Sequence, residues 1–237
     1  MSANQRNEFF TALLVGAMAN PAFEVKATGE TMRHLWALAD VAAYHKERRE
    51  SPREMALRWI KKNYVIVDTE TTGLGSDAQI IEIAVIDLKG NVLINTLIKP
   101  TIAIPAEATA IHDITDEMVA DAPSWRDVLP EVIESIGDCW IAYNAEFDKR
   151  MIEQEAGGLL GSYSSVTLGS LCAMQLYAEF NGEWNTFRRQ YKWKKLVEAA
   201  TALNAWPESA GEDVPHRALY DCRLTLGVIR VIAGVAL

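Results

Sequence analysis

The sequence has few cysteines, a deficit of basic residues and no long apolar run. Three of its 237 residues are cysteine, widely spaced and without a C-x-x-C pair, which argues against a disulfide framework and a zinc site. Its 23 basic residues against 32 acidic ones give a net charge of −9, which argues against a protein that coats nucleic acid. No stretch approaches the ~18 apolar residues of a membrane span. We therefore expect a soluble, cytoplasmic protein with no membrane contact, whose contact with any nucleic acid is local or metal-mediated.

The first part of the chain has a helical pattern. Apolar residues over 32–43 recur every three or four positions, and residues 51–54 form a capping box that would begin another helix. We predict a helical appendage over residues 1–62, followed by a second domain over residues 63–237. The appendage would pack on that domain, bind a protein partner or mediate self-association. The apolar run over 9–19 resembles a signal region, but the acidic residue directly before it favours a buried helix.

Strands begin to alternate with helices after residue 63. Apolar runs over 64–68, 79–88 and 91–98 predict three strands, and the last two would form a hairpin through Lys89-Gly90. Strands followed by alternating helices and strands predict an α/β domain, a mixed sheet covered by helices. The other expected elements are a strand over 139–143 and helices over 115–121, 124–136, 145–156, 170–180, 192–203 and 217–233.

Two carboxylates follow the first expected strand. Side chains on a strand alternate faces, so Asp68 and Glu70 should point to the same side, about 7 Å apart along the chain. Two such anions repel each other unless a cation lies between them or they share a proton. Asp148 and Asp221 lie in two other segments, and four carboxylates would suit the oxygen-preferring ions Mg²⁺ or Mn²⁺. The spacing alone does not show that these segments meet in space.

Three motifs resemble, in order and spacing, those of the DnaQ-like 3′–5′ exonucleases, in the histidine-bearing branch of the four-carboxylate superfamily. They are DTETTGL at 68–74, NAEFD at 144–148 and H-x-A-L-x-D-x-x-x-T at 216–225. The resemblance covers about residues 62–237. It implies a ribonuclease-H-like α/β fold, a mixed sheet of about five strands flanked by helices.

The resemblance also implies the roles of individual residues. Asp68, Glu70, Asp148 and Asp221 match the family's metal-binding acids, which hold two Mg²⁺ or Mn²⁺ ions per site. His216 matches the general base, and an imidazole titrates close enough to neutral pH for that task. Position 217 is arginine, so the tyrosine of the sister branch is absent.

Further residues match the family's substrate contacts. The resemblance implies that the terminal nucleotide is gripped after the first acids, with Leu74 as a wedge against the last base. Two matches are imperfect, since Asp113 and Tyr143 stand where the family often has glycine and histidine. The candidate contacts of this kind are Thr71, Thr72, Gly73, Leu74, His112, Asn144 and Phe147.

Residues 180–195 interleave basic and aromatic residues. Such a mixture suits a single nucleic-acid strand, because cations bind phosphates and rings stack on bases. The alternative is a helix with an aromatic core face and a solvated basic face. Our candidates for strand contact are Trp193, Lys194 and Lys195.

The predicted function is a metal-dependent 3′–5′ exonuclease. It would hydrolyse phosphodiester bonds at the 3′ end of single-stranded or frayed DNA and release nucleoside 5′-monophosphates. One alternative is an exoribonuclease with the same site, since the motifs do not report on the 2′-OH. A second is a non-catalytic scaffold module of a polymerase or repair complex.

Overall fold

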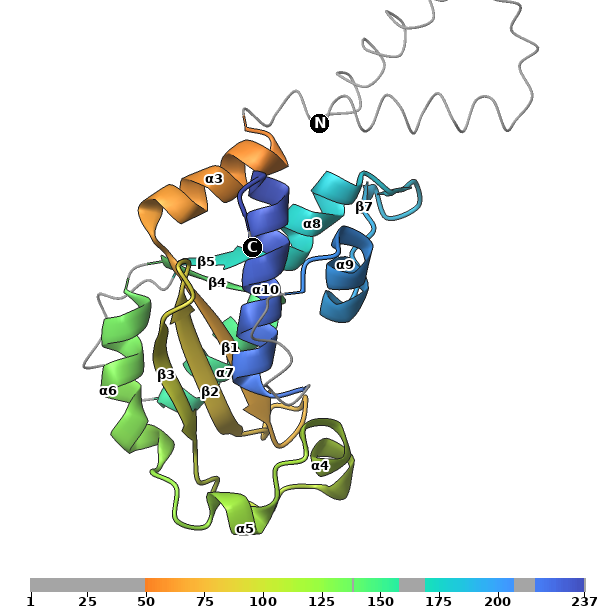
Figure 1. Cartoon of the computed structure of the whole chain (residues 1–237). Helices are drawn as coiled ribbons and strands as arrows, with labels where there is room; N and C mark the ends of the chain where they lie inside the picture. Colours follow the sequence, from red (N-terminus) through yellow and green to blue (C-terminus); the bar gives the residue numbers. More distant parts are fainter. Residues whose placement is uncertain (1–49, 138, 158–168, 207–215, 237) are drawn as a thin grey trace, which may run out of the picture. The chain divides into compact units, whose positions relative to one another are not determined.

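The computed structural model describes residues 50–137, 139–157, 169–206 and 216–236 (Figure 1). Most of the predicted appendage, residues 1–49, lies outside this range. The described chain belongs to two units, one of Pro52–Phe180 with Trp193–Leu237 and one that contains Asn181–Lys192.

The larger unit is built on a mixed sheet of five strands in the order β3-β2-β1-β4-β5. The first three strands pair antiparallel, whereas β4 and β5 add to β1 in parallel. Every residue of β2 is buried, which explains the nearly continuous apolar run of that strand. The strands are β1 (Val65–Thr71), β2 (Ile80–Asp87), β3 (Val92–Leu97), β4 (Cys139–Ala142) and β5 (Gly169–Cys172).

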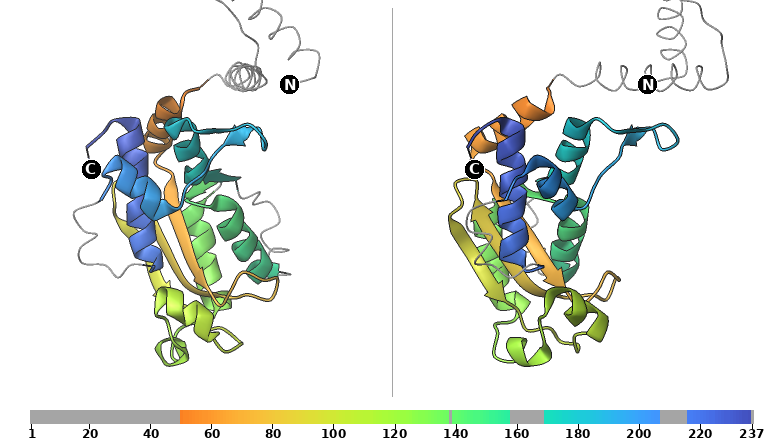
Figure 2. Two further views of the ribbon diagram at one scale, coloured as in Figure 1. Left: turned by 90° about the vertical axis from the view of Figure 1, so that its right-hand side faces the viewer. Right: turned by 45° about the vertical axis from the view of Figure 1, so that its right-hand side comes forward.

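Helices cover both faces of this sheet (Figure 2). The side of β1 that carries Ile66 packs with α3, α8, α9 and α10, and the opposite side, with Val65 and Val67, packs with α6 and α7. The predicted α/β fold with about five strands is therefore confirmed. The helices are α3 (Pro52–Lys62), α4 (Ala106–His112), α5 (Asp116–Val119), α6 (Trp125–Ile136), α7 (Ala145–Ala156), α8 (Ala173–Asn181), α9 (Leu196–Leu203) and α10 (Ala218–Ala233).

Helix α3 packs against α10, at the other end of the chain. Trp59 is 1% exposed and lies in the same apolar cluster as Ile229 and Ile232 of α10. Arg53 Nε donates a hydrogen bond to the carbonyl oxygen of Ala233 at 3.2 Å. The helix that we had grouped with the appendage thus belongs to the same unit as the sheet.

One helix was not predicted, and two predicted helices begin later than expected. Residues 106–112 form the unpredicted helix, α4, which packs through Ala108 on Ile104 and Ile114. The helix expected over 170–180 begins at Ala173, because the preceding residues pair with β4 as β5. The helix expected from residue 192 begins at Leu196, after an extended segment.

The smaller unit includes a short hairpin, β6 (Trp184–Asn185) with β7 (Gln190–Tyr191). The rings of Trp184 and Tyr191 pack edge to face, with centroids 5.0 Å apart. Asn185 Oδ1 accepts the backbone N–H of Phe187 and of Arg188, which holds the turn, and Phe187 is 93% exposed. The basic and aromatic segment therefore follows the end of α8 as a hairpin and then residues without regular secondary structure, not as the helix of the alternative interpretation.

Candidate active site

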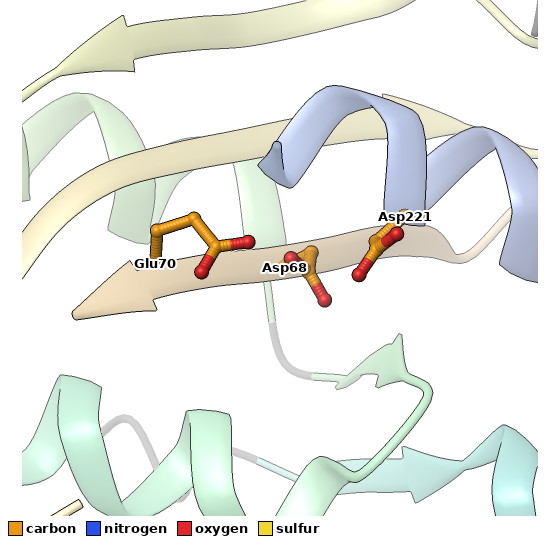
Figure 3. A group of neighbouring side chains, drawn as sticks. All are labelled: Asp68, Glu70 and Asp221. Carbon is orange, nitrogen blue, oxygen red and sulfur yellow. The ribbon is translucent and has the colours of Figure 1, made fainter. Parts of the chain in front are cut away.

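Three carboxylates from two distant segments meet on one face of the sheet. Asp68 and Glu70 project from the end of β1, and Asp221 reaches them from the first turns of α10 (Figure 3). One ligand oxygen of each lies within 4.8 Å of those of the other two. The structure thus brings the first and third motifs together, which their spacing in the sequence does not show.

Asp148 approaches the same cluster from α7. It lies in the first turn of that helix and is 4% exposed. Thr69, between the two acids of β1, donates a hydrogen bond from Oγ1 to Asp148 Oδ1 at 2.9 Å. The charge of Asp148 raises the pKa of Asp68, so the two carboxylates lie within electrostatic reach of each other.

Burial and mutual repulsion both disfavour ionisation of these acids. Burial raises the pKa of Asp68 well above its usual range, and the charges of Asp148 and Asp221 raise it further. Burial, with the charges of Asp221 and Glu82, raises the pKa of Glu70 to about 9. A divalent cation would reverse this balance, and carboxylate oxygens are the ligands that Mg²⁺ and Mn²⁺ prefer. Asp68, Glu70 and Asp221 therefore fit such a site in ligand chemistry and in charge. Asp148 is not part of this 4.8 Å group, and one of its oxygens accepts the hydrogen bond from Thr69.

His216 precedes α10, as expected from the third motif. Its side chain is exposed and its backbone is in the left-handed region, with φ of 57°. Burial raises the pKa of Asp221 to about 6, while the charge of His216 acts to lower it. The imidazole thus lies within electrostatic reach of the acid cluster.

The loop after β1 carries the residues expected to grip a terminal nucleotide. Thr71 Oγ1 donates to the Gly73 carbonyl oxygen at 2.7 Å, and Thr72 Oγ1 accepts the Gln79 N–H at 2.9 Å. Leu74 at the tip is 79% exposed. Arg150 of α7 donates to the Leu74 carbonyl oxygen at 3.2 Å, which attaches the loop to the helix of the second motif.

The second motif begins where β4 ends. Asn144 is the exposed N-cap residue of α7, and the half-buried Phe147 ring packs under the Arg150 guanidinium, 5.3 Å from its centroid. Tyr143, where the family often has histidine, donates from its hydroxyl to the Lys194 carbonyl oxygen at 2.9 Å. That bond anchors the segment with Lys194 and Trp193, which is 52% exposed, beside the second motif.

His112 lies at the end of α4 and is 2% exposed. Its Nδ1 accepts the N–H of Ile114 at 3.0 Å. Burial lowers the pKa of His112, and the backbone of Thr71 acts in the opposite direction. The imidazole therefore packs beside the start of the first-motif loop, and its contact with a substrate stays a prediction.

One charged pair beside the acids was not predicted from the sequence. Glu82 of β2 is 3% exposed and forms an ion pair with Arg217, the residue between His216 and α10. A single acid within the apolar stretch IIEIAVI was the available signal. A residue of that kind needs a buried partner.

Comparisons with known proteins identify the family of this chain. A family model described as exonuclease, of the RNase T type, matches residues 65–229. An uncharacterized exonuclease, CP81 of Escherichia phage 186, is 48% identical over 185 residues, which are 76% of this chain and 93% of that protein. Exodeoxyribonuclease 10 of Escherichia coli K12 is 33% identical over 169 residues, 69% of this chain and 66% of the relative.

A solved structure of exonuclease X in complex with 5′ overhanging duplex DNA has the same fold. It superposes with a TM-score of 0.56 at 28% identity and covers 73% of this chain and 94% of its own. The chain belongs to the RNase T family of DnaQ-like exonucleases, and it is a nuclease. No helix in the described ranges could span a membrane.

Proposed function

We propose that this chain is a Mg²⁺- or Mn²⁺-dependent 3′–5′ exodeoxyribonuclease. It would remove nucleotides from the 3′ end of single-stranded or frayed DNA as nucleoside 5′-monophosphates. The observation that carries the proposal is the approach of Asp68, Glu70 and Asp221 to within 4.8 Å of one another.

The choice of DNA and of the 3′ end is supported by relatives. One is named exodeoxyribonuclease, and another was solved with a duplex that has a 5′ overhang. Such a duplex has a recessed 3′ end, which is the terminus that a 3′–5′ exonuclease requires. A chain with a net charge of −9 must meet the DNA through local cations and bound metal.

Asp68, Glu70, Asp148 and Asp221 would hold two divalent ions. When bound, the ions would supply Lewis-acid activation of water and stabilisation of the leaving 3′ oxygen. The carboxylates would remain ionised under the positive charge, in spite of their burial. Thr69 would keep Asp148 in place through the hydrogen bond from its hydroxyl.

His216 would act as the general base. Its exposed imidazole, on the residue before the N-cap of α10, would accept a proton from the attacking water. Since backbone of left-handed conformation is uncommon outside glycine, a specific role for this residue would account for its φ of 57°.

The substrate would be held by two surfaces on either side of the second motif. Leu74 would pack against the last base, supported by Arg150 behind its loop. Trp193 and Lys195 would contact nucleotides of the DNA strand further from its 3′ end. The hydrogen bond from Tyr143 holds Lys194, between them, beside the second motif. Rings on bases and cations on phosphates bind single strands with little sequence preference.

A time course with matched DNA and RNA oligonucleotides tests the proposal. Each carries a label at its 5′ end, so 3′–5′ hydrolysis should give a descending ladder, whereas 5′–3′ hydrolysis would release the label at once as a mononucleotide. Activity should require Mg²⁺ or Mn²⁺ and should be lost in Asp68→Asn. The matched control is Asp87→Asn, another buried acid, at the far end of β2 from Glu82.

Each other outcome rejects a specific part of the proposal. Full activity in excess chelator would exclude the metal mechanism. Faster hydrolysis of RNA would identify an exoribonuclease. Binding of both oligonucleotides without hydrolysis would favour the scaffold alternative.

A further inference from the structure

Glu82 is a buried carboxylate beside the active site that the four-acid chemistry does not use. It is 3% exposed in the middle of the sheet, on β2. In the β1–β2 ladder it lies directly opposite Glu70, so the two side chains project from the same face. Like charges opposite each other in a ladder are destabilising, so a structural or functional benefit must offset this pairing.

Both oxygens of Glu82 are occupied by the segment that carries the third motif. Arg217 Nε lies 3.0 Å from each oxygen, and Arg217 Nη2 also donates to Oε1. The backbone N–H of Ala218 donates to Oε2 at 2.9 Å. Both oxygens of Glu82 are therefore engaged by protein donors.

These contacts hold the start of α10. Arg217 is the N-cap residue, but its side chain makes no capping hydrogen bond, and Glu82 satisfies the N–H of the first helical residue instead. A carboxylate at this position also interacts favourably with the helix dipole. The N–H of Asp221 donates to the Arg217 carbonyl oxygen at 3.1 Å. A displacement of Arg217 would therefore also displace Asp221.

We propose that Glu82 is a positioning residue for the third motif. By holding Arg217 and the Ala218 N–H, it sets where His216 and Asp221 stand relative to the acids of β1. Glu82 and Arg217 are 135 positions apart in the sequence. Their contact therefore joins the sheet that carries the first motif to the segment that carries the third. The inference rests on the proposed roles of His216 and Asp221.

The test compares Glu82→Gln and Arg217→Lys with wild type and with Asp87→Asn. Asp87 is a buried, hydrogen-bonded acid on the same strand, at the hairpin end, so it controls for loss of a buried carboxylate. Glu82→Gln should lower the single-turnover rate constant by about 10²-fold, the usual effect of a misplaced catalytic group. KM for the oligonucleotide should change less than ~3-fold. Calorimetric Mg²⁺ affinity should fall, because Asp221 is one of the proposed metal ligands, whereas Asp87→Asn should retain the wild-type rate constant and Mg²⁺ affinity. Arg217→Lys keeps the charge but not the paired geometry and should give an intermediate rate constant.

A double-mutant cycle separates positioning from general stabilisation. If Glu82 acts through His216, adding Glu82→Gln to His216→Ala should slow the reaction by less than ~3-fold more. Hydrogen exchange gives a readout independent of activity, since the Ala218 amide should exchange faster in Glu82→Gln while amides of β1 remain protected.

Fully additive losses together with an unchanged Mg²⁺ affinity, or an unchanged rate constant in Glu82→Gln, would overturn the inference. If Glu82→Gln does not fold, the decision rests on Arg217→Lys, and a wild-type rate constant in that variant would also overturn it. A wild-type protein that releases no nucleotides would instead reject the proposed function. The two failures are therefore distinguishable.

Discussion

The acid cluster should make the metal-free protein less stable as the pH rises, and Asp148→Asn should remove part of that loss. Burial raises the pKa of Asp148 from 3.8 to about 7, against the hydrogen bond from Thr69, which lowers it. When folding raises the pKa of a carboxyl group, the folded protein is most stable below the pKa of the unfolded state. The free energy of unfolding then falls as the pH rises through the pKa of the folded state. At 1.36 kcal/mol for each pKa unit, Asp148 alone corresponds to on the order of 4 kcal/mol lost between about pH 4 and about pH 8.

Asparagine at this position stays neutral, and its oxygen can still accept the Thr69 hydroxyl. We therefore expect metal-free Asp148→Asn to exceed wild type in free energy of unfolding by several kcal/mol at about pH 8, and by much less at about pH 5. Urea unfolding in excess chelator over this range measures the difference. Added Mg²⁺ should stabilise wild type more than the variant at high pH, because it binds the folded site.

Asp87→Asn provides a control of opposite sign. Burial would raise the pKa of Asp87, but hydrogen bonds from Asn91, Lys89 and Gly90 outweigh it and lower the pKa. Its contribution is present above the unfolded pKa and is lost only in acid, so Asp87→Asn should destabilise evenly between about pH 5 and about pH 8. A wild-type stability in chelator that is flat or rises over this range would refute the argument, as would an Asp148→Asn curve parallel to wild type.

Three further predictions concern the base, the strand contact and the packing of α3. His216→Ala should slow single-turnover hydrolysis by roughly 10²- to 10⁴-fold with Mg²⁺ affinity retained in calorimetry, and an unchanged rate constant would exclude a general base there. Trp193→Ala with Lys195→Ala should weaken single-strand binding and reduce the slope of log K against log salt by ~0.7, measured by fluorescence anisotropy; an unchanged slope would mean that the lysine is only solvated. Trp59→Ala should lower the free energy of unfolding in urea by about 3 to 5 kcal/mol, because this side chain is 1% exposed against α10; a loss below ~1 kcal/mol would show that the packing of α3 contributes little to stability.

Much of the fold was predictable because its signals are local. The apolar runs of β1 and β2 and the hairpin at Gly90, with φ of 97°, depend on residues close in sequence. Helix α4 and strand β5 were missed for the opposite reason. Each is short. Strand β5 forms because the backbone of residues 169–172 pairs with β4, and this pairing cannot be predicted from the pattern of four residues.

The chemical groups of the site can be found in the sequence: the acids, their order in three motifs, and a histidine five residues before the last acid. How these groups meet depends on long-range packing. The hydrogen bond from Thr69 to Asp148 spans 79 positions, and that from Arg217 to Glu82 spans 135. Neither can be predicted from a local sequence pattern. Such contacts form when helices pack on a sheet and bring distant polar groups together out of water, where each must find a partner.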